Sequence, residues 1–203
     1  MKIIFIGPQA CGKGTQAKIL SKKLNIAHIS TGDLFRSLDG ELKQEVDATI
    51  NQGNLVPDEL TVKILKERLN QSDAEQGFIL DGFPRNMNQA KLLETITQPE
   101  KIIEITLPDQ EAIRRLSGRL NCKSCGAIFN KFTNPPKQEN ICDNCQGELA
   151  QRGDDKEDAV KKRLTTYHNE TEPILEYYGE KVIKINGEQP IEDIAKEIEE
   201  KVK

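Results

Sequence analysis

The stretch Ile3-Ile4-Phe5-Ile6-Gly7-Pro8-Gln9-Ala10-Cys11-Gly12-Lys13-Gly14-Thr15 decides how the rest of the chain is organised. Its first four residues are β-branched or aromatic, which predicts a strand buried on both faces. A helical stripe follows, with apolar residues at Ala17, Ile19, Leu20 and Leu24. The glycine-rich segment therefore joins a strand to a helix N-terminus. There, backbone N–H groups, the helix dipole and Lys13 can hold phosphate oxygens. The alternative is a glycine-rich turn with an exposed lysine.

Composition narrows the class of protein. The chain has 203 residues, of which 36% are hydrophobic and 31% charged, and its net charge is −4. This length favours one sizeable domain with insertions. The acidic balance argues against general nucleic-acid binding. No apolar run approaches the ~18 residues of a membrane span and no leader pattern follows Met1, so we expect a cytoplasmic protein without membrane contact.

Four of the five cysteines form two C-x-x-C pairs, separated by sixteen residues: Cys122, Cys125, Cys142 and Cys145. This spacing is typical of a zinc site, and disulfides are disfavoured in a reducing cytosol. Four thiolates close the coordination shell, so the predicted metal is structural. Iron, a redox pair or a vestigial site are the alternatives.

A second motif spans Gly77 to Arg85. The apolar run Phe78–Leu80 ends at Asp81, which in a chain with a phosphate loop predicts the carboxylate that orients magnesium. A helix cap or a turn aspartate is the alternative interpretation. Arg85 follows the strand at the edge where open α/β sheets bind ligands.

Strands near residues 3, 27, 78, 102 and 183 alternate with helices, which predicts an α/β fold: a five-stranded parallel sheet with helices on both faces. Asp58 and Asp109 are expected to cap helices, and a long helix from about 156 to 178 is interrupted near Pro173. Two segments do not fit the repeat, 31–57 and 119–156. We expect them to be lids over the carboxyl edge of the sheet, leaving 1–30, 58–118 and 157–203 as the core.

The motifs resemble those of adenylate kinases of the long, zinc-bearing bacterial type, over essentially the whole chain. Besides the cysteine pairs, the resemblance is carried by Gly12–Gln16, Ser30–Arg36, Leu55–Glu59, Gly77–Arg85, Gln89, Arg115–Arg119, Gln151–Asp155 and Ile185–Gly187. It implies a P-loop kinase core and the reaction MgATP + AMP = 2 ADP, by direct in-line transfer with lid closure excluding water. The implied partners are ATP, AMP and ADP, with Mg²⁺ and structural Zn²⁺ as cofactors. A monomer that binds no nucleic acid is expected.

The resemblance also implies roles for individual residues. The ATP site comprises Gly12, Lys13, Gly14, Thr15, Arg115 and Arg119. Magnesium is oriented by Thr15 and Asp81. The AMP site comprises Thr31, Arg36, Val56, Gly82, Arg85, Gln89, Arg152 and Arg163, with Thr31 and Gln89 near the adenine. The catalytic set is Lys13, Arg85, Arg119, Arg152 and Arg163, which suits phosphate because guanidinium groups pair with it bidentately.

The chain departs from this family in three places. Gln9-Ala10 replaces the usual proline-glycine of the loop, and alanine would be strained if position 10 has a positive φ. The 31–57 segment is shorter than is usual, and Leu120 stands where many relatives have an arginine. A UMP/CMP kinase, or a zinc-ribbon nucleic-acid-binding ATPase, are the alternative functions.

Cys11 lies outside the zinc set, beside Gly12 and Lys13. Positive potential at a helix start lowers the pKa of a thiol. One hypothesis is therefore that Cys11 reacts fastest of the five cysteines and is protected by ATP. The alternative is a small side chain with a packing role only.

Overall fold

The computed structural model describes residues 1–203. Its centre is a five-stranded sheet in the order β2-β3-β1-β4-β8. The strands are β1 (Lys2–Ile6), β2 (Ala27–Ser30), β3 (Phe78–Asp81), β4 (Lys101–Thr106) and β8 (Val182–Asn186). All four pairings are parallel, and Asp81 is in register with both Phe5 and Ser30. The predicted α/β fold and its five strands are confirmed.

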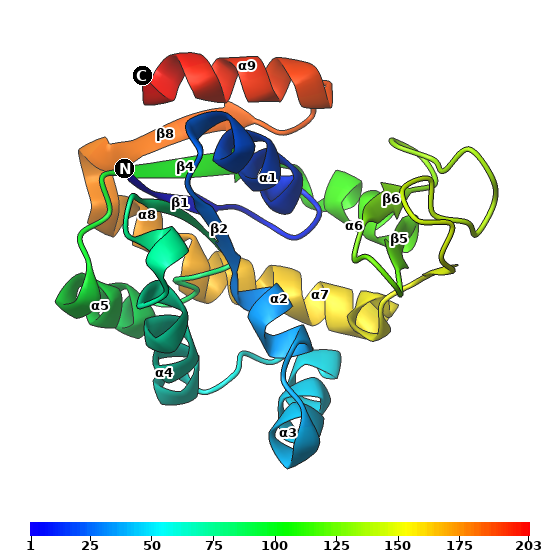
Figure 1. Ribbon diagram of the computed structural model, residues 1–203, viewed down its shortest axis with the longest axis horizontal. Helices are drawn as coiled ribbons and strands as arrows, with labels where there is room; N and C mark the ends of the chain where they lie inside the picture. Colours follow the sequence, from blue (N-terminus) through cyan, green and yellow to red (C-terminus); the bar gives the residue numbers. More distant parts are fainter.

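Helices cover both faces of this sheet because side chains alternate along the buried strands. Ile3 and Phe5 of β1 pack in one cluster with residues of α1 (Lys13–Leu24), α6 (Asp109–Ser117), α7 (Glu157–Thr166) and α9 (Ile191–Val202). Ile4 and Ile6 pack in a second cluster with α4 (Asp58–Leu69), α5 (Met87–Ile96) and α8 (Pro173–Tyr178). Figure 1 shows α9 above the sheet and α4 and α5 below it.

The predicted interruption of the long helix lies at a π-helical turn, Tyr167–Thr171, between α7 and α8. Proline at position 173 clashes with a regular helix in the turn before it, so the helix widens there. Accordingly, the N–H of Glu172 donates to the carbonyl of Tyr167, 2.8 Å away. No helix in the structure combines the length and the apolar character that a bilayer crossing requires.

The helix-cap predictions have mixed outcomes. Ser30 caps α2 (Thr31–Arg36) through a 3.3 Å hydrogen bond from the Asp33 N–H. The expectation that Asp58 and Asp109 cap their helices is wrong, because Pro57 and Pro108 occupy the cap positions. Each aspartate instead starts its helix and directs its carboxylate to another element.

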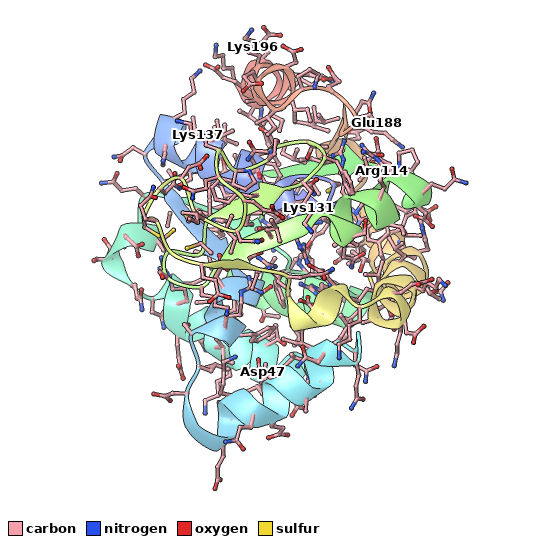
Figure 2. The ribbon with its side chains drawn as sticks, turned by 90° about the vertical axis from the view of Figure 1, so that its right-hand side faces the viewer. Asp47, Arg114, Lys131, Lys137, Glu188 and Lys196 are labelled. Carbon is pink, nitrogen blue, oxygen red and sulfur yellow. The ribbon has the colours of Figure 1, made fainter.

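Two segments extend beyond the core sheet. The 31–57 segment contains α2 and α3 (Gly40–Asn51), around a small cluster of Phe35, Val46 and Val56. The 119–156 segment contains an antiparallel sheet in the order β6-β5-β7, from β5 (Arg119–Cys122), β6 (Ile128–Asn130) and β7 (Leu149–Ala150). Figure 2 shows the loops carrying Lys131 and Lys137 in front of the sheet edge, with α3, carrying Asp47, below them.

Candidate active site

One cavity of about 600 Å³ opens at the carboxyl edge of the sheet. Its walls come from the loop after β1, the ends of β2 and β3, and both the 31–57 and 119–156 segments. Apart from the zinc cysteines, every predicted site residue lines it: Gly12, Lys13, Gly14, Thr15, Thr31, Arg36, Val56, Asp81, Gly82, Arg85, Gln89, Arg115, Arg119, Arg152 and Arg163. Residues distant in sequence are thus brought to one place.

The loop between β1 and α1 has the backbone of a phosphate cradle. Gly12 adopts φ 100° at the start of α1. Ala10 adopts φ 61°, so the strain expected of alanine at this position is present. The ammonium of Lys13 donates to the carbonyls of Gly7 and Pro8, at 2.6 and 2.7 Å. A cation and the N-terminus of a 12-residue helix therefore meet at this loop.

Asp81 ends β3 directly beside this loop. Its Oδ2 lies 3.1 Å from the position that a Cβ on Gly14 would occupy, so only glycine leaves this approach open. Thr15 lines the same part of the cavity. A carboxylate and a hydroxyl are hard oxygen donors of the kind Mg²⁺ prefers, so these residues fit the magnesium that the sequence predicts.

The predicted AMP residues surround the turn after β3. Gly82 has φ 82°, and a side chain there would meet the hydroxyl of Thr31 and the guanidinium of Arg85, 3.0 and 3.1 Å away. The Gly82 carbonyl accepts hydrogen bonds from Thr31 Oγ1 (2.9 Å) and Arg85 Nε (2.8 Å). Burial lowers the pKa of Arg85, against the opposing effect of Asp81. Arg36 pairs with Asp33 nearer the surface.

Two adjacent buried aspartates hold the arginines of the opposite wall. Arg119 pairs with Asp155 through both Nε (2.8 Å) and Nη2, and the carboxylate of Asp155 is fully buried. Arg163 Nη1 donates to the carboxylate of Asp154 at 2.8 Å. Burial raises the pKa of Asp154, but Arg163, Arg119 and Arg152 lower it below its ordinary value. The carboxylate of Asp154 therefore remains a charged partner of Arg163.

Two further arginines are held by neutral groups as well as by charge. Arg152 Nε donates to Asn121 Oδ1 at 2.7 Å, and Arg115 Nη1 to the Gly187 carbonyl at 3.0 Å. Burial, with repulsion from Arg119 and Arg36, lowers the pKa of Arg152 to about 10. Burial likewise lowers the pKa of Arg163 to about 10. Arg115 and Arg163 each have a carboxylate partner, whereas Arg152 forms no ion pair, so its part of the cavity favours an anion.

The four zinc cysteines converge at the far side of the 119–156 segment. Their sulfur atoms all lie within 4.8 Å of one another, with Cys122–Cys145 at 3.4 Å and Cys125–Cys142 at 3.6 Å. Four thiolates at ~2.3 Å from one ion would be about 3.8 Å apart, so the set fits tetrahedral zinc. The backbone N–H of Cys125 lowers the pKa of Cys122 to about 6, which favours the thiolate. Leu120 is buried in this segment.

The burial of Cys11 weighs against the hypothesis that it is the fastest-reacting of the five cysteines, although Lys13 Nζ lies 3.5 Å from its sulfur. Its side chain has no exposed surface and belongs to the core cluster on the α1 face of the sheet. A thiol reacts as an accessible thiolate, and packing among apolar side chains prevents that access. The packing role is therefore the one that the structure supports.

Some residues at the site have no role in the sequence-based prediction. Asp154 and Asp155 belong to a quoted motif, but nothing in the sequence pairs them with Arg163 and Arg119. His28 lies with its Nε2 3.6 Å from Asp81 Oδ2, and no hydrogen-bond partner satisfies that buried nitrogen. Asp58 binds the Gln89 side chain from α4. The register of β2 on β3 brings His28 to Asp81, and the packing of α4 on α5 brings Asp58 to Gln89.

Comparisons with known proteins agree with this geometry. The family model described as adenylate kinase matches residues 5–183. An adenylate kinase of Acetivibrio thermocellus is 47% identical, covering 98% of this chain and 96% of that protein. One of Borrelia turicatae is also 47% identical, over 98% of this chain and 97% of its own length. One of Archaeoglobus fulgidus is 44% identical over the full length of both.

The resemblance found in the motifs is thereby confirmed, and neither a UMP/CMP kinase nor a zinc-ribbon ATPase is favoured. A phosphate loop, a ring of arginines and relatives matched over nearly the whole length lead to the same conclusion. The chain belongs to the adenylate kinase family.

Proposed function

We propose that the chain catalyses MgATP + AMP = 2 ADP in the cavity at the carboxyl edge of the sheet. The observation that carries this is the convergence of Lys13 with arginines from the core and from the 119–156 segment on one cavity. Adenylate kinases as a family act on ATP, AMP and ADP. Six arginines around one phosphate loop exceed what a single nucleotide requires, which supports two nucleotides in one site.

We assign one nucleotide to each end of the cavity from the residues that line it. ATP phosphates would be held by Gly12–Thr15, Arg115 and Arg119. AMP would lie against Thr31, Arg36, Val56, Gly82, Arg85 and Gln89, with Arg152 and Arg163 between the two nucleotides. Mg²⁺ would be held by Thr15 and Asp81, and when bound it neutralises charge on the ATP phosphate oxygens.

The chemical step would be a direct displacement. A phosphate oxygen of AMP forms a bond to the γ-phosphorus as the bond to the oxygen of the departing ADP breaks. Charge is spread over the transferring group, so arginines fixed in advance stabilise that state without reorganising. Closure of the 31–57 and 119–156 segments would exclude water, which otherwise competes as the acceptor.

The four cysteines would hold a structural zinc ion. They do not line the cavity, and four thiolates leave no position for water or substrate. The ion would therefore contribute to the stability of the 119–156 segment and take no part in the reaction.

The activity can be tested by measuring ADP formation from ATP with AMP, CMP, UMP or GMP as the acceptor. We expect AMP to exceed the others by more than tenfold in kcat/KM, because an unpaired base edge costs ~1–3 kcal/mol. Lys13→Met and Arg85→Ala should each lower kcat/KM at least ~10²-fold while the protein stays folded. Lys22→Met and Arg68→Ala, exchanges outside the cavity, are the controls. Comparable rates with CMP or UMP would refute the proposal.

A further inference from the structure

The carboxamide of Gln89 is held in one orientation by two partners. Gln89 lies in the first turn of α5, is 2% exposed and lines the cavity. Its Oε1 accepts the backbone N–H of Arg85 at 2.8 Å. Its Nε2 donates to Asp58 Oδ1 at 2.7 Å. The adenine-reading end of the proposed AMP site is therefore attached to a carboxylate from another helix.

Asp58 is itself surrounded by amide donors from α5 and its cap. Its Oδ1 also accepts from Asn86 Nδ2 at 2.9 Å, and its Oδ2 accepts from Asn88 Nδ2 at 2.7 Å. Burial raises the pKa of Asp58, but these three amides lower it below its ordinary value. The group is thus a charged, acceptor-only carboxylate at neutral pH. It does not line the cavity, so it would not touch substrate.

The two hydrogen-bond partners allow only one orientation of the Gln89 amide. A backbone N–H only donates and a carboxylate only accepts. Turned over, the amide would place its oxygen against the Asp58 carboxylate and its NH₂ against the Arg85 N–H, so both hydrogen bonds would be lost. These two partners therefore fix the orientation of the Gln89 amide.

In this orientation one hydrogen on Nε2 and one lone pair on Oε1 remain for a ligand. A 6-aminopurine offers the complementary pair, an amino donor beside the N1 acceptor. A 6-oxopurine offers the reverse, an oxygen acceptor beside an N1–H donor. An amide free to turn over would accept either base, whereas the amide held by Asp58 matches the aminopurine alone.

We propose that Asp58 is a positioning residue that sets base selectivity at the AMP site by locking the Gln89 amide; this rests on the proposed role of Gln89 as the adenine reader. A mere helix-capping role does not account for the contacts. Asp58 makes no cap hydrogen bond in α4, and every side-chain bond it accepts comes from residues 86–89.

The test compares AMP with inosine monophosphate, a 6-oxopurine nucleotide, as acceptors. Asp58→Asn is nearly isosteric, but its amide can present an NH₂ to Gln89 as well as an oxygen, so only the Arg85 N–H still opposes the reversed amide. We expect the AMP-to-inosine monophosphate ratio of kcat/KM to fall at least tenfold, through the KM of the acceptor, with the KM of ATP unchanged. Glu59→Gln removes the same charge from the exposed neighbour and should leave the ratio within twofold.

Two further variants separate the possible failures. Asp58→Glu keeps the charge at the start of α4 but displaces the carboxylate by one methylene, so the ratio should fall at least threefold even if Asp58→Asn does not fold. If Gln89→Ala abolishes base selectivity and folded Asp58 variants retain it, the positioning role of Asp58 is refuted, and the role of Gln89 in recognising adenine is supported. If Gln89→Ala also retains base selectivity, Gln89 does not recognise adenine, and the proposed role of Asp58 in positioning it is wrong as well.

Discussion

The 31–57 and 119–156 segments close the same cavity but are held together in different ways. The 31–57 segment packs Phe35, Val46 and Val56 with partly buried residues that include Leu60 and Ile64 of α4, so its core continues into the body of the protein. The 119–156 segment buries five residues among themselves, and two of these are Cys122 and Cys142. One segment is thus an extension of the main core, and the other is a separate unit too small to be stable on apolar packing alone.

The difference leads us to expect different motions of the two segments. We expect the 31–57 segment to move with α2 and α3 while these helices keep their contacts with α4. We expect the 119–156 segment, once zinc is bound, to move as a unit on α6, to which it is attached by the hydrogen bond from Asn130 Nδ2 to the Arg115 carbonyl (2.7 Å). Four changes test this contrast, given from the largest expected effect to the smallest.

Removing the metal should act on the 119–156 segment alone. Cys142→Ser, or chelation of zinc, should lower the local stability of this segment by at least ~3 kcal/mol, since structural zinc contributes ~10–16 kcal/mol in small domains. Hydrogen exchange should accelerate in 119–156 and stay unchanged in 31–57, with much of the activity kept at low temperature. Asn144→Ser, at an exposed position between Cys142 and Cys145, is the control. Equal acceleration in both segments would contradict the contrast.

A substitution that opens a cavity in the 31–57 segment should destabilise that segment and leave the 119–156 segment unchanged. Val46 is 2% exposed, and Val46→Ala should destabilise the 31–57 segment by about 2 kcal/mol through lost burial and a residual cavity. The KM of AMP should rise, while hydrogen exchange in 119–156 stays as in the parent. Leu42→Ala on the exposed side of α3 removes a larger side chain and should change little. A rise in the KM of ATP alone would be the contrary result.

The same conservative exchange in each segment should affect different kinetic constants. Arg119→Lys keeps a cation for Asp155 but loses the planar fork, so kcat should fall about tenfold, or ~1.4 kcal/mol. Arg36→Lys should raise the KM of AMP by a similar factor with little change in kcat. Arg68→Lys, which pairs with Asp73 away from the cavity, serves as the control. If both site variants altered kcat alone, the division of labour would be wrong.

The smallest effect is a pH dependence where the π-helical turn contacts the start of α6. His168 bonds Glu172 through Nδ1 (2.7 Å) and Asp109, which starts α6, through Nε2 (3.0 Å). These two carboxylates raise the pKa of His168 above 6.5. The stabilisation is therefore complete below pH 6.5 and is lost as pH rises through the raised value. Because the ring is 42% exposed, we expect less than ~1 kcal/mol.

Melting temperatures of the parent and of His168→Gln from pH 5.5 to 9 would measure this contribution. The parent should be the more stable at low pH, and the two should converge as the pH rises. An advantage that grows with pH would reverse the sign and contradict the assignment.

Much of the fold could be predicted because local patterns agree with it. The buried run Ile3–Ile6, the glycine loop and the alternation of strands and helices were sufficient for the sheet and the phosphate loop. The clustering of the four cysteines followed from their spacing alone. These features depend on residues close together in sequence, or on strand order that chain connectivity restricts.

Contacts between distant elements were not predictable in this way. Asp58 and Asp109 have the residue type and position of helix caps, yet the prolines before them take that position. Their carboxylates then bind groups of α5 and of the π-helical turn. Cys11 was interpreted from the charge of its loop, whereas its side chain is buried in the core cluster on the α1 face of the sheet. Each error concerns a side chain whose partner lies in another element, which propensity does not describe.

The pairs that Arg119 and Arg163 form with Asp155 and Asp154 have a consequence for how the site responds to salt. Without nucleotide, these arginines already have carboxylates of the protein as neighbours, so few dissolved counterions accumulate around them. An arriving phosphate exchanges with, or joins, carboxylates that belong to the protein, and few dissolved ions are released. Occupancy of the cavity should therefore depend on ionic strength far less than its number of arginines suggests, because buried pairs are screened weakly.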